Sequence, residues 1–125
     1  MNSQLLCCDN IEFNKQESYH VLGRVINRLD ISTMPKVIEF YVLIKLFDIE
    51  PNKTYEVELQ LKDSEERLFS YTEKIILYNR RMPEQVQGVD FSTPMKAVIT
   101  KCGNYNVELF IDGKIATSYP IYVCN

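Results

Sequence analysis

The four cysteines are the residues of this sequence best suited to chemistry. Cys7 and Cys8 are adjacent, whereas Cys102 and Cys124 lie far along the chain. If the Asp-Gly dipeptide at 112–113 forms a two-residue hairpin loop, Cys102 falls near Cys124, and Cys7 or Cys8 would join them if the first strand paired beside the last. Such thiols suit a zinc or redox site, but zinc-ligand pairs about two to four residues apart are missing. We therefore interpret the cysteines as small buried side chains and expect no metal and no cofactor.

The single histidine, His20, is the next candidate for chemistry. Ser18 stands two residues before it, a spacing that places both side chains on one face of a strand. A nucleophile and base also need an orienting acid, and no pattern supplies one, so we expect a half-exposed histidine in a sheet. Acidic residues are scattered, and the four glycines are never grouped, so neither a carboxylate pair nor a phosphate-binding loop is predicted. The sequence therefore predicts a protein that is not an enzyme.

Aromatic side chains are the feature that remains after these exclusions. The chain has eight tyrosines, six phenylalanines and no tryptophan, more than one sandwich core needs if several of them point outward. Tyrosine and arginine are frequent at the energetic centres of protein interfaces. We therefore predict a surface that binds a partner protein, composed of Tyr41, Arg80, Arg81, Phe110, Tyr119 and Tyr122.

Charge and length limit the classes of partner and of architecture. The 125 residues carry a net charge of −3, and the densest basic spot is Arg80-Arg81, so nucleic acid is not an expected partner. The longest apolar stretch, residues 40–46, is too short to span a bilayer, and the first ten residues do not resemble a signal peptide. We expect one cytoplasmic domain over residues 1–125 with no membrane contact.

Two adjacent segments predict the central strands. Tyr55, Val57, Leu59 and Leu61 alternate with polar residues, as in a strand with one face in water. The preceding segment, Lys36–Phe47, also alternates, and its second face is mixed, which predicts that this face is partly covered. A turn cluster at residues 50–53 separates the two segments.

The last third of the chain predicts a hairpin. Residues 105–111 alternate, the Asp-Gly dipeptide at 112–113 suits a tight turn, and the return strand runs from Lys114 towards Cys124. Ile115, Thr117, Tyr119, Ile121 and Val123 share one phase of that strand. Because Pro120 cannot donate a ladder hydrogen bond, we expect an edge or a bulge at that position.

Weaker patterns complete the expected fold. Strands are predicted over residues 4–8, 19–27, 68–77, 85–91 and 96–101, and a short helical turn over residues 28–34. Many short strands with regular turn signals are typical of an antiparallel β-sandwich, here of about seven to nine strands.

A resemblance sharpens this expectation. The run from Cys102 to Val107 resembles the entry to the sixth strand of immunoglobulin-like sandwiches, where a tyrosine hydrogen-bonds back across the corner, the role that Tyr105 would take. The pattern from Gly103 to Val123 is similar to that of a family of small bacterial and phage proteins, in which it closes the sandwich. The resemblance implies an immunoglobulin-like sandwich and brings no activity. The core disulfide and tryptophan of antibody domains are absent.

The sequence therefore favours a non-catalytic protein-binding module, from a bacterium or phage and acting on a host or defence protein. The alternative is a structural component of a virion or scaffold that self-associates through edge strands. A metal protein built on the cysteines is the weakest alternative.

Overall fold

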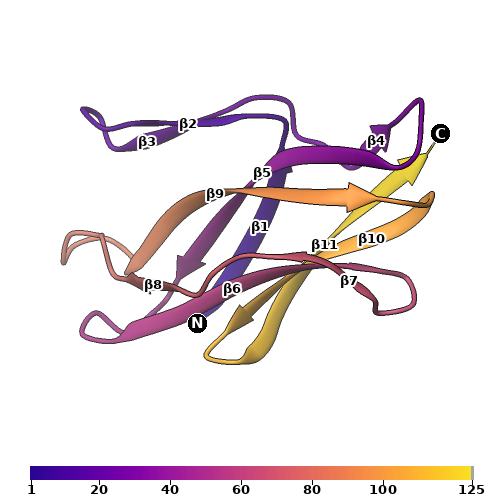
Figure 1. Cartoon of the computed structure of the whole chain (residues 1–125). Coiled ribbons are helices and arrows are strands. Elements are labelled where there is room, and N and C mark those ends of the chain that lie inside the picture. Colours follow the sequence, from indigo (N-terminus) through magenta and orange to yellow (C-terminus); the bar gives the residue numbers. More distant parts are fainter. Residues whose placement is uncertain (125) are drawn as a thin grey trace.

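The computed structural model describes residues 1–124, and this part of the chain forms eleven strands in three sheets (Figure 1). The all-β prediction is confirmed, and the strands exceed the expected number because several are only three or four residues long. Within residues 1–124, no helix has the length and apolar character needed to cross a bilayer. In chain order the strands are β1 (Asn2–Cys8), β2 (Ile11–Asn14), β3 (Tyr19–Leu22), β4 (Arg28–Asp30), β5 (Lys36–Phe47), β6 (Thr54–Asp63), β7 (Leu68–Tyr71), β8 (Ile75–Tyr78), β9 (Gly88–Ile99), β10 (Gly103–Ile111) and β11 (Lys114–Cys124).

Two of the sheets differ in width. The smaller has the order β1-β5-β9, and the larger has the order β4-β11-β10-β6-β7, with β8 pairing to β6 beyond the end of β7. The third sheet is the hairpin of β2 and β3. Within the described residues, strand pairs are antiparallel except for β4 with β11.

The core lies between the two larger sheets. The predicted inward face of β5 is buried from Ile38 to Leu46, and Phe40, Val42 and Ile44 have no exposed surface. The alternate residues of β6 and β10 join the same cluster, so both sheets contribute to one apolar layer. Each side chain of this size contributes about 1.5–3 kcal/mol when it is removed from water.

The second face of β5 is partly covered, as its mixed composition predicted, although Val37 on this face is 60% exposed. A smaller cluster forms there, separate from the main core. Its buried members are Cys8, Ile11 and Leu43, and Leu6, Leu22 and Tyr41 pack against them. The β2–β3 hairpin therefore lies over the outer face of the smaller sheet.

The sequence-based prediction was wrong at several short strands and at the long strand β9. Residues 28–34 form no helical turn; β4 occupies residues 28–30 and pairs in parallel with the end of β11. The predicted strand over residues 68–77 is two strands, β7 and β8, and the two predicted strands at 85–91 and 96–101 are one, β9. Of the strand predicted over residues 19–27, only residues 19–22 form a strand, β3. Such segments take their form from the strand that they pair with, which local alternation does not reveal.

The C-terminal hairpin has the predicted register. Asp112 and Gly113 both have positive φ, and Ile111 pairs with Lys114. The bulge lies between Leu109 and Phe110 and not at Pro120, and it moves Ile115 to the outer face opposite Phe110, contrary to the phase that we predicted. Pro120 lies beyond the β4 pairing, so its edge is free of a neighbouring strand.

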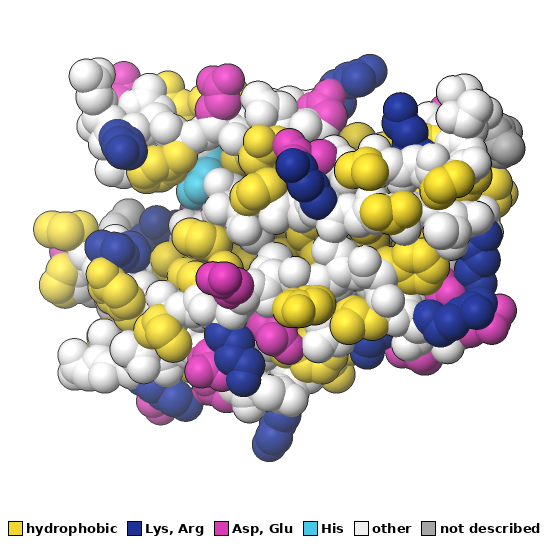
Figure 2. All heavy atoms as spheres, viewed as in Figure 1, with side chains coloured by type: hydrophobic (Ala, Val, Ile, Leu, Met, Phe, Trp, Pro, Cys, Tyr) yellow, Lys and Arg dark blue, Asp and Glu magenta, His cyan; other side chains and the backbone are white. Residues whose placement is uncertain are grey.

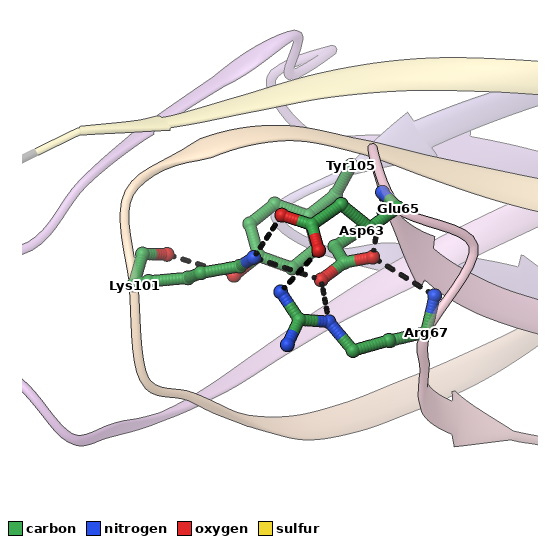
Figure 3. A network of polar contacts seen from close by, with 5 residues as sticks. All are labelled: Asp63, Glu65, Arg67, Lys101 and Tyr105. Carbon is green, nitrogen blue, oxygen red and sulfur yellow. Dashed lines mark hydrogen bonds and ion pairs between the residues drawn. The ribbon is translucent and has the colours of Figure 1, made fainter.

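A polar network fixes one end of the sandwich (Figure 3). Asp63 is the last residue of β6 and is only 2% exposed. Its carboxylate accepts bonds from the backbone amides of Glu65 and Arg67, each at 2.9 Å. It also accepts from the Arg67 guanidinium at 3.0 Å and lies 3.1 Å from the Lys101 ammonium. Asp63 therefore joins the β6–β7 turn to the β9–β10 loop.

Tyr105 completes the same corner. Its hydroxyl donates to the carbonyl of Lys101 at 2.7 Å, which is the back-bond predicted for this tyrosine. Tyr105 as a whole is 1% exposed. Its ring packs edge to face against the ring of Phe69, with 5.2 Å between the ring centroids. The corner thus combines a buried ring, a satisfied hydroxyl and the Asp63 network.

The Asp63 network predicts an acid-sensitive fold. Burial alone would raise the pKa of Asp63, but the donated hydrogen bonds lower it to about 2. The stability that this group contributes is full above its unfolded pKa of about 3.9 and is lost as the pH falls towards 2. The urea unfolding midpoint should therefore fall between pH 4 and pH 2. Asp63→Asn should be less stable at pH 7 and lose less over that interval; an equal loss would contradict the assignment.

Tyr105→Phe tests the corner hydrogen bond by itself. The ring remains, and only the donor to the Lys101 carbonyl is removed. We expect a loss of about 1 kcal/mol in the free energy of unfolding, measured by urea denaturation. Tyr119→Phe, which removes another bonded hydroxyl, is a matched comparison. A neutral Tyr105→Phe variant would show that the bond does not stabilise the fold.

Candidate functional site

A cleft with several chemical groups lies between the β2–β3 hairpin and β8 and has a volume of about 620 Å³. Figure 2 shows it as a notch on the left side of the molecule, lined by the histidine drawn in cyan. We name it the hairpin cleft. It is lined by Phe13, Ser18 and His20 of the hairpin, by Ile75–Tyr78 of β8, by Arg80 and Arg81, and by residues 89–92 of β9.

The segment between β8 and β9 is ordered by one amide side chain. The Asn79 carbonyl oxygen accepts from the amides of Arg81 at 3.1 Å and Gly88 at 2.9 Å, and its amide nitrogen donates to Gln87. The Arg80 amide donates to the Gly88 carbonyl at 2.8 Å. A Cβ at Gly88 would lie 2.4 Å from the Leu46 carbonyl oxygen, so this close approach of β9 to β5 requires glycine. The two arginines are thereby held at the mouth of the cleft.

The charges of the cleft are unevenly paired. Arg81 lies 2.8 Å from Asp90, and Lys45 lies 3.0 Å from the other oxygen of the same carboxylate. Burial acts to raise the pKa of Asp90, but these two bonds hold it below its usual value, so Asp90 stays ionised. Arg80 stacks on Tyr78, with its guanidinium carbon 4.3 Å from the ring centroid, and forms no ion pair with any described residue. The cleft therefore carries an excess of positive charge in a chain of net charge −3.

His20 is half-buried in β3 at the edge of the cleft, as expected for a sheet histidine. Its ring lies 4.9 Å from that of Phe13. Burial lowers the pKa of His20. The negative charge of Asp90 acts to raise this pKa, and the positive charges of Lys45 and Arg81 lower it further. Ser18 lines the same cleft, but among residues 1–124 no hydrogen bond joins it to His20. These surroundings favour the neutral imidazole, and in the part of the chain that the structure describes no hydrogen bond joins it to a serine or cysteine.

The six residues predicted to bind a partner are not brought together. Arg80 and Arg81 line the hairpin cleft. Phe110 and Tyr122 lie on the outer face of the larger sheet, where Lys62 is 5.5 Å from the Phe110 ring and Arg28 is 5.9 Å from the Tyr122 ring. The predicted surface is therefore at least two separate places.

The other two predicted residues are engaged within the fold. Tyr41 packs against the small core under the hairpin. Tyr119 packs against the main core, and its hydroxyl donates to the Ile26 carbonyl at 2.6 Å. Both side chains are half-buried, so part of each stays accessible.

The cysteines lie in different surroundings. Cys7 and Cys8 are fully buried, one in each cluster, and burial raises the pKa of both. Cys102 is exposed and stands one residue before the Gly103–Val123 pair, so the register brings it towards Cys124, as predicted. The Cys124 thiol donates a hydrogen bond to the Asp30 carboxylate. Within residues 1–124 all four are free, and no group of three or more histidine, cysteine or acidic residues is placed to hold a metal ion.

Sequence reasoning missed most of the cleft. Phe13, Tyr78 and Ile76 are 50%, 43% and 53% exposed, and none of them is among the six residues of the predicted binding surface. The sequence could indicate such residues only where an apolar side chain stands at a position that the alternation of a strand assigns to a polar one. β2 and β8 have four residues each, too few to define that alternation. What the assembled cleft can do is bind: it offers exposed rings and an arginine that lacks a carboxylate partner.

Fold and site together define an all-β protein with a cleft beside the edge of its smaller sheet. The chain belongs to the family of unknown function DUF6941, whose model matches residues 3–124. No curated protein matches it. Among solved structures, the β-glucosidase from Listeria innocua in complex with isofagomine is similar over 99% of this chain, with 14% identity and a TM-score of 0.41. The chain spans 16% of that enzyme's length, and a likeness this weak carries no argument about activity.

The surroundings of His20 predict its titration. Followed by NMR, its pKa should lie below 6.5. Phe13→Ala should raise it by exposing the ring, whereas Asp90→Asn should lower it further by removing an attracting charge. Because the unfolded chain binds this proton more readily, His20 should reduce stability as the pH falls through 6.5. A midpoint above 6.5 in the parent protein would contradict this environment.

Proposed function

We propose that this chain is a non-catalytic protein-binding module that holds part of a partner protein in the hairpin cleft. The observation that supports the proposal is the presence of exposed apolar side chains beside Arg80, which has no carboxylate partner among residues 1–124. Exposed apolar surface next to a polar rim is typical of protein interfaces. The resemblance to bacterial and phage proteins adds the expectation that the partner is a host or defence protein.

We also propose that the sandwich is immunoglobulin-like. The order β4-β11-β10-β6, opposed to β1-β5-β9, supports this, as does the bond from Tyr105 at the start of β10. Sandwiches of this kind present loops and edges for recognition while the core remains unchanged.

Self-assembly through edge strands has less support. Pro94 interrupts β9, the edge strand of the smaller sheet, and Pro120 interrupts β11 where β4 does not cover it. Proline on an edge strand limits pairing with another copy. A monomeric mass by analytical ultracentrifugation at high concentration would exclude the assembly alternative.

The test is affinity capture with matched surface variants. The tagged chain is incubated with lysate of its source organism or host, and bound proteins are identified by mass spectrometry. Tyr78→Asp and Arg80→Glu alter exposed cleft residues, whereas Phe110→Asp and Tyr122→Asp alter the outer face of the larger sheet. We expect one protein in stoichiometric amount, lost with the cleft variants and kept with the outer-face variants.

The other outcomes are equally informative. A partner lost only with the Phe110 and Tyr122 variants would contradict the cleft as the binding site. Recovery of no partner by a monomeric chain would contradict the binding module itself. Circular dichroism of each variant controls for folding.

A further inference from the structure

The smaller sheet has fewer strands than the larger sheet, and its last strand, β9, borders the hairpin cleft. It has three strands, and the path of the larger sheet has five, with β8 continuing the β7 edge. Both β7 and β8 come close to β9: Ser70 of β7 donates to the Lys96 carbonyl, and Arg80, just after β8, donates to the Gly88 carbonyl. In Figure 1, β7 and β8 lie beneath β9, on the side away from β5. Among residues 1–124 no strand pairs with this outer edge of β9, and between those two contacts the edge borders the hairpin cleft.

The backbone of β9 is directed outward at that edge. Gly88 donates to Asn79 and accepts from Arg80, so its peptide groups point away from β5. The carbonyl of Lys96 accepts from Ser70, so Lys96 points the same way. Since β5 and β9 pair in continuous register from Gly88 to Ile99, every second residue between them shares this direction.

Asp90 and Ser92 are the two residues of that phase between Gly88 and Pro94. Each presents an N–H and a C=O at the edge, and both residues line the cleft. Pro94 follows in the same phase and has no N–H, so the edge ends there. The Arg80–Gly88 bond closes the other end. The open edge is thus bounded and short, sufficient for about five residues of an added strand.

Both faces of an added strand would meet side chains already in place. On the hairpin side, Phe13 and His20 overhang the cleft. On the side of the larger sheet, Ile75 and Leu77 pack towards the core and line the same cleft. Alternate side chains of an extended segment would therefore be covered on both faces.

Charge indicates what that segment carries. Arg81 and Lys45 both pair with one carboxylate, Asp90, and Arg80, which lines the same cleft, forms no ion pair among residues 1–124, so these four residues carry a net charge of +2. Arg80 is exposed beside the open edge. An aspartate or glutamate in the segment would complete the pairing.

From these observations, and resting on the proposed function, we propose that the cleft takes an extended segment of a partner protein as a fourth strand of the smaller sheet. The segment hydrogen-bonds to the backbone of Asp90 and Ser92, alternates apolar side chains, and places an acidic side chain at Arg80.

The experiment selects peptides and then tests their backbone contacts. A displayed library of random ten-residue peptides is selected against the intact chain, and the enriched peptide is synthesised. We expect alternating apolar residues with an aspartate or glutamate. Ser92→Pro removes a donor that faces the cleft without touching the pairing to β5, as Pro94 already does, and should weaken binding about 10-fold or more. Ser92→Ala, which keeps the backbone, should bind within about twofold.

A second measurement leaves the protein unchanged, so it stands even if Ser92→Pro misfolds. The peptide is N-methylated at single positions along its length. A paired strand directs alternate N–H groups towards β9, so methylation should abolish binding at every second position and be tolerated between. In the unmodified complex, the Asp90 and Ser92 amides should exchange with solvent more slowly than in the free chain. Arg80→Glu should favour peptides whose acidic residue is replaced by lysine.

Several results would overturn the proposal. These are no enriched peptide, binding equal in Ser92→Pro and Ser92→Ala, methylation effects without alternation, or self-association of the chain through this edge. If captured partners depend on Tyr78 and Arg80 but not on Ser92, the binding module stands and strand addition is wrong. If they depend on none of the three, the chain still binds a partner, but the cleft is not the binding site and strand addition is wrong.

Discussion

The alternation of apolar and polar residues along β5, β6 and β10 is the constraint on which the other features depend. Because side chains alternate faces, each of these strands can bury its apolar set in only one register. A slip of one residue in β6 would turn Val57 and Leu59 to water and bring glutamate and glutamine into the apolar layer. That register in turn places Asp63 at the end of β6, opposite Tyr105, where the two sides of the corner meet.

The same constraint explains how much of the fold could be predicted. The strands β5, β6, β10 and β11 and the Asp112-Gly113 hairpin are encoded locally, by period and by turn residues, so they were predicted with nearly correct bounds, whereas the long strand β9 was predicted as two strands. The short strands β2, β4, β7 and β8 have too few residues to show a period. The parallel pairing of β4 depends on the end of β11, almost the whole chain away. The bulge at Leu109 and Phe110 is also invisible in the alternation, which is why Ile115 was assigned to the wrong face.

Only the part of the candidate site that lies within one loop could be predicted from the sequence. Arg80 and Arg81 stand in a loop that the sequence identifies, and they line the cleft. The rest of the cleft is formed where the β2–β3 hairpin, β8 and β9 lie close together. This arrangement depends on the position of the hairpin over the smaller sheet. Tyr41 and Tyr119, which we predicted on the binding surface, are half-buried and also pack against the two clusters of the core, and a count of tyrosines does not reveal this double placement.

The small core beneath the hairpin has an evolutionary consequence. Cys8, Ile11 and Leu43 form a cluster separate from the main apolar layer, and the hairpin contributes only Ile11 and Leu22 to it. Substitutions elsewhere in β2 and β3 therefore leave the sandwich intact. Recognition and folding can diverge at different rates in such a chain: the hairpin can acquire new sequences, lengths or charges while the strands beneath it stay under packing selection.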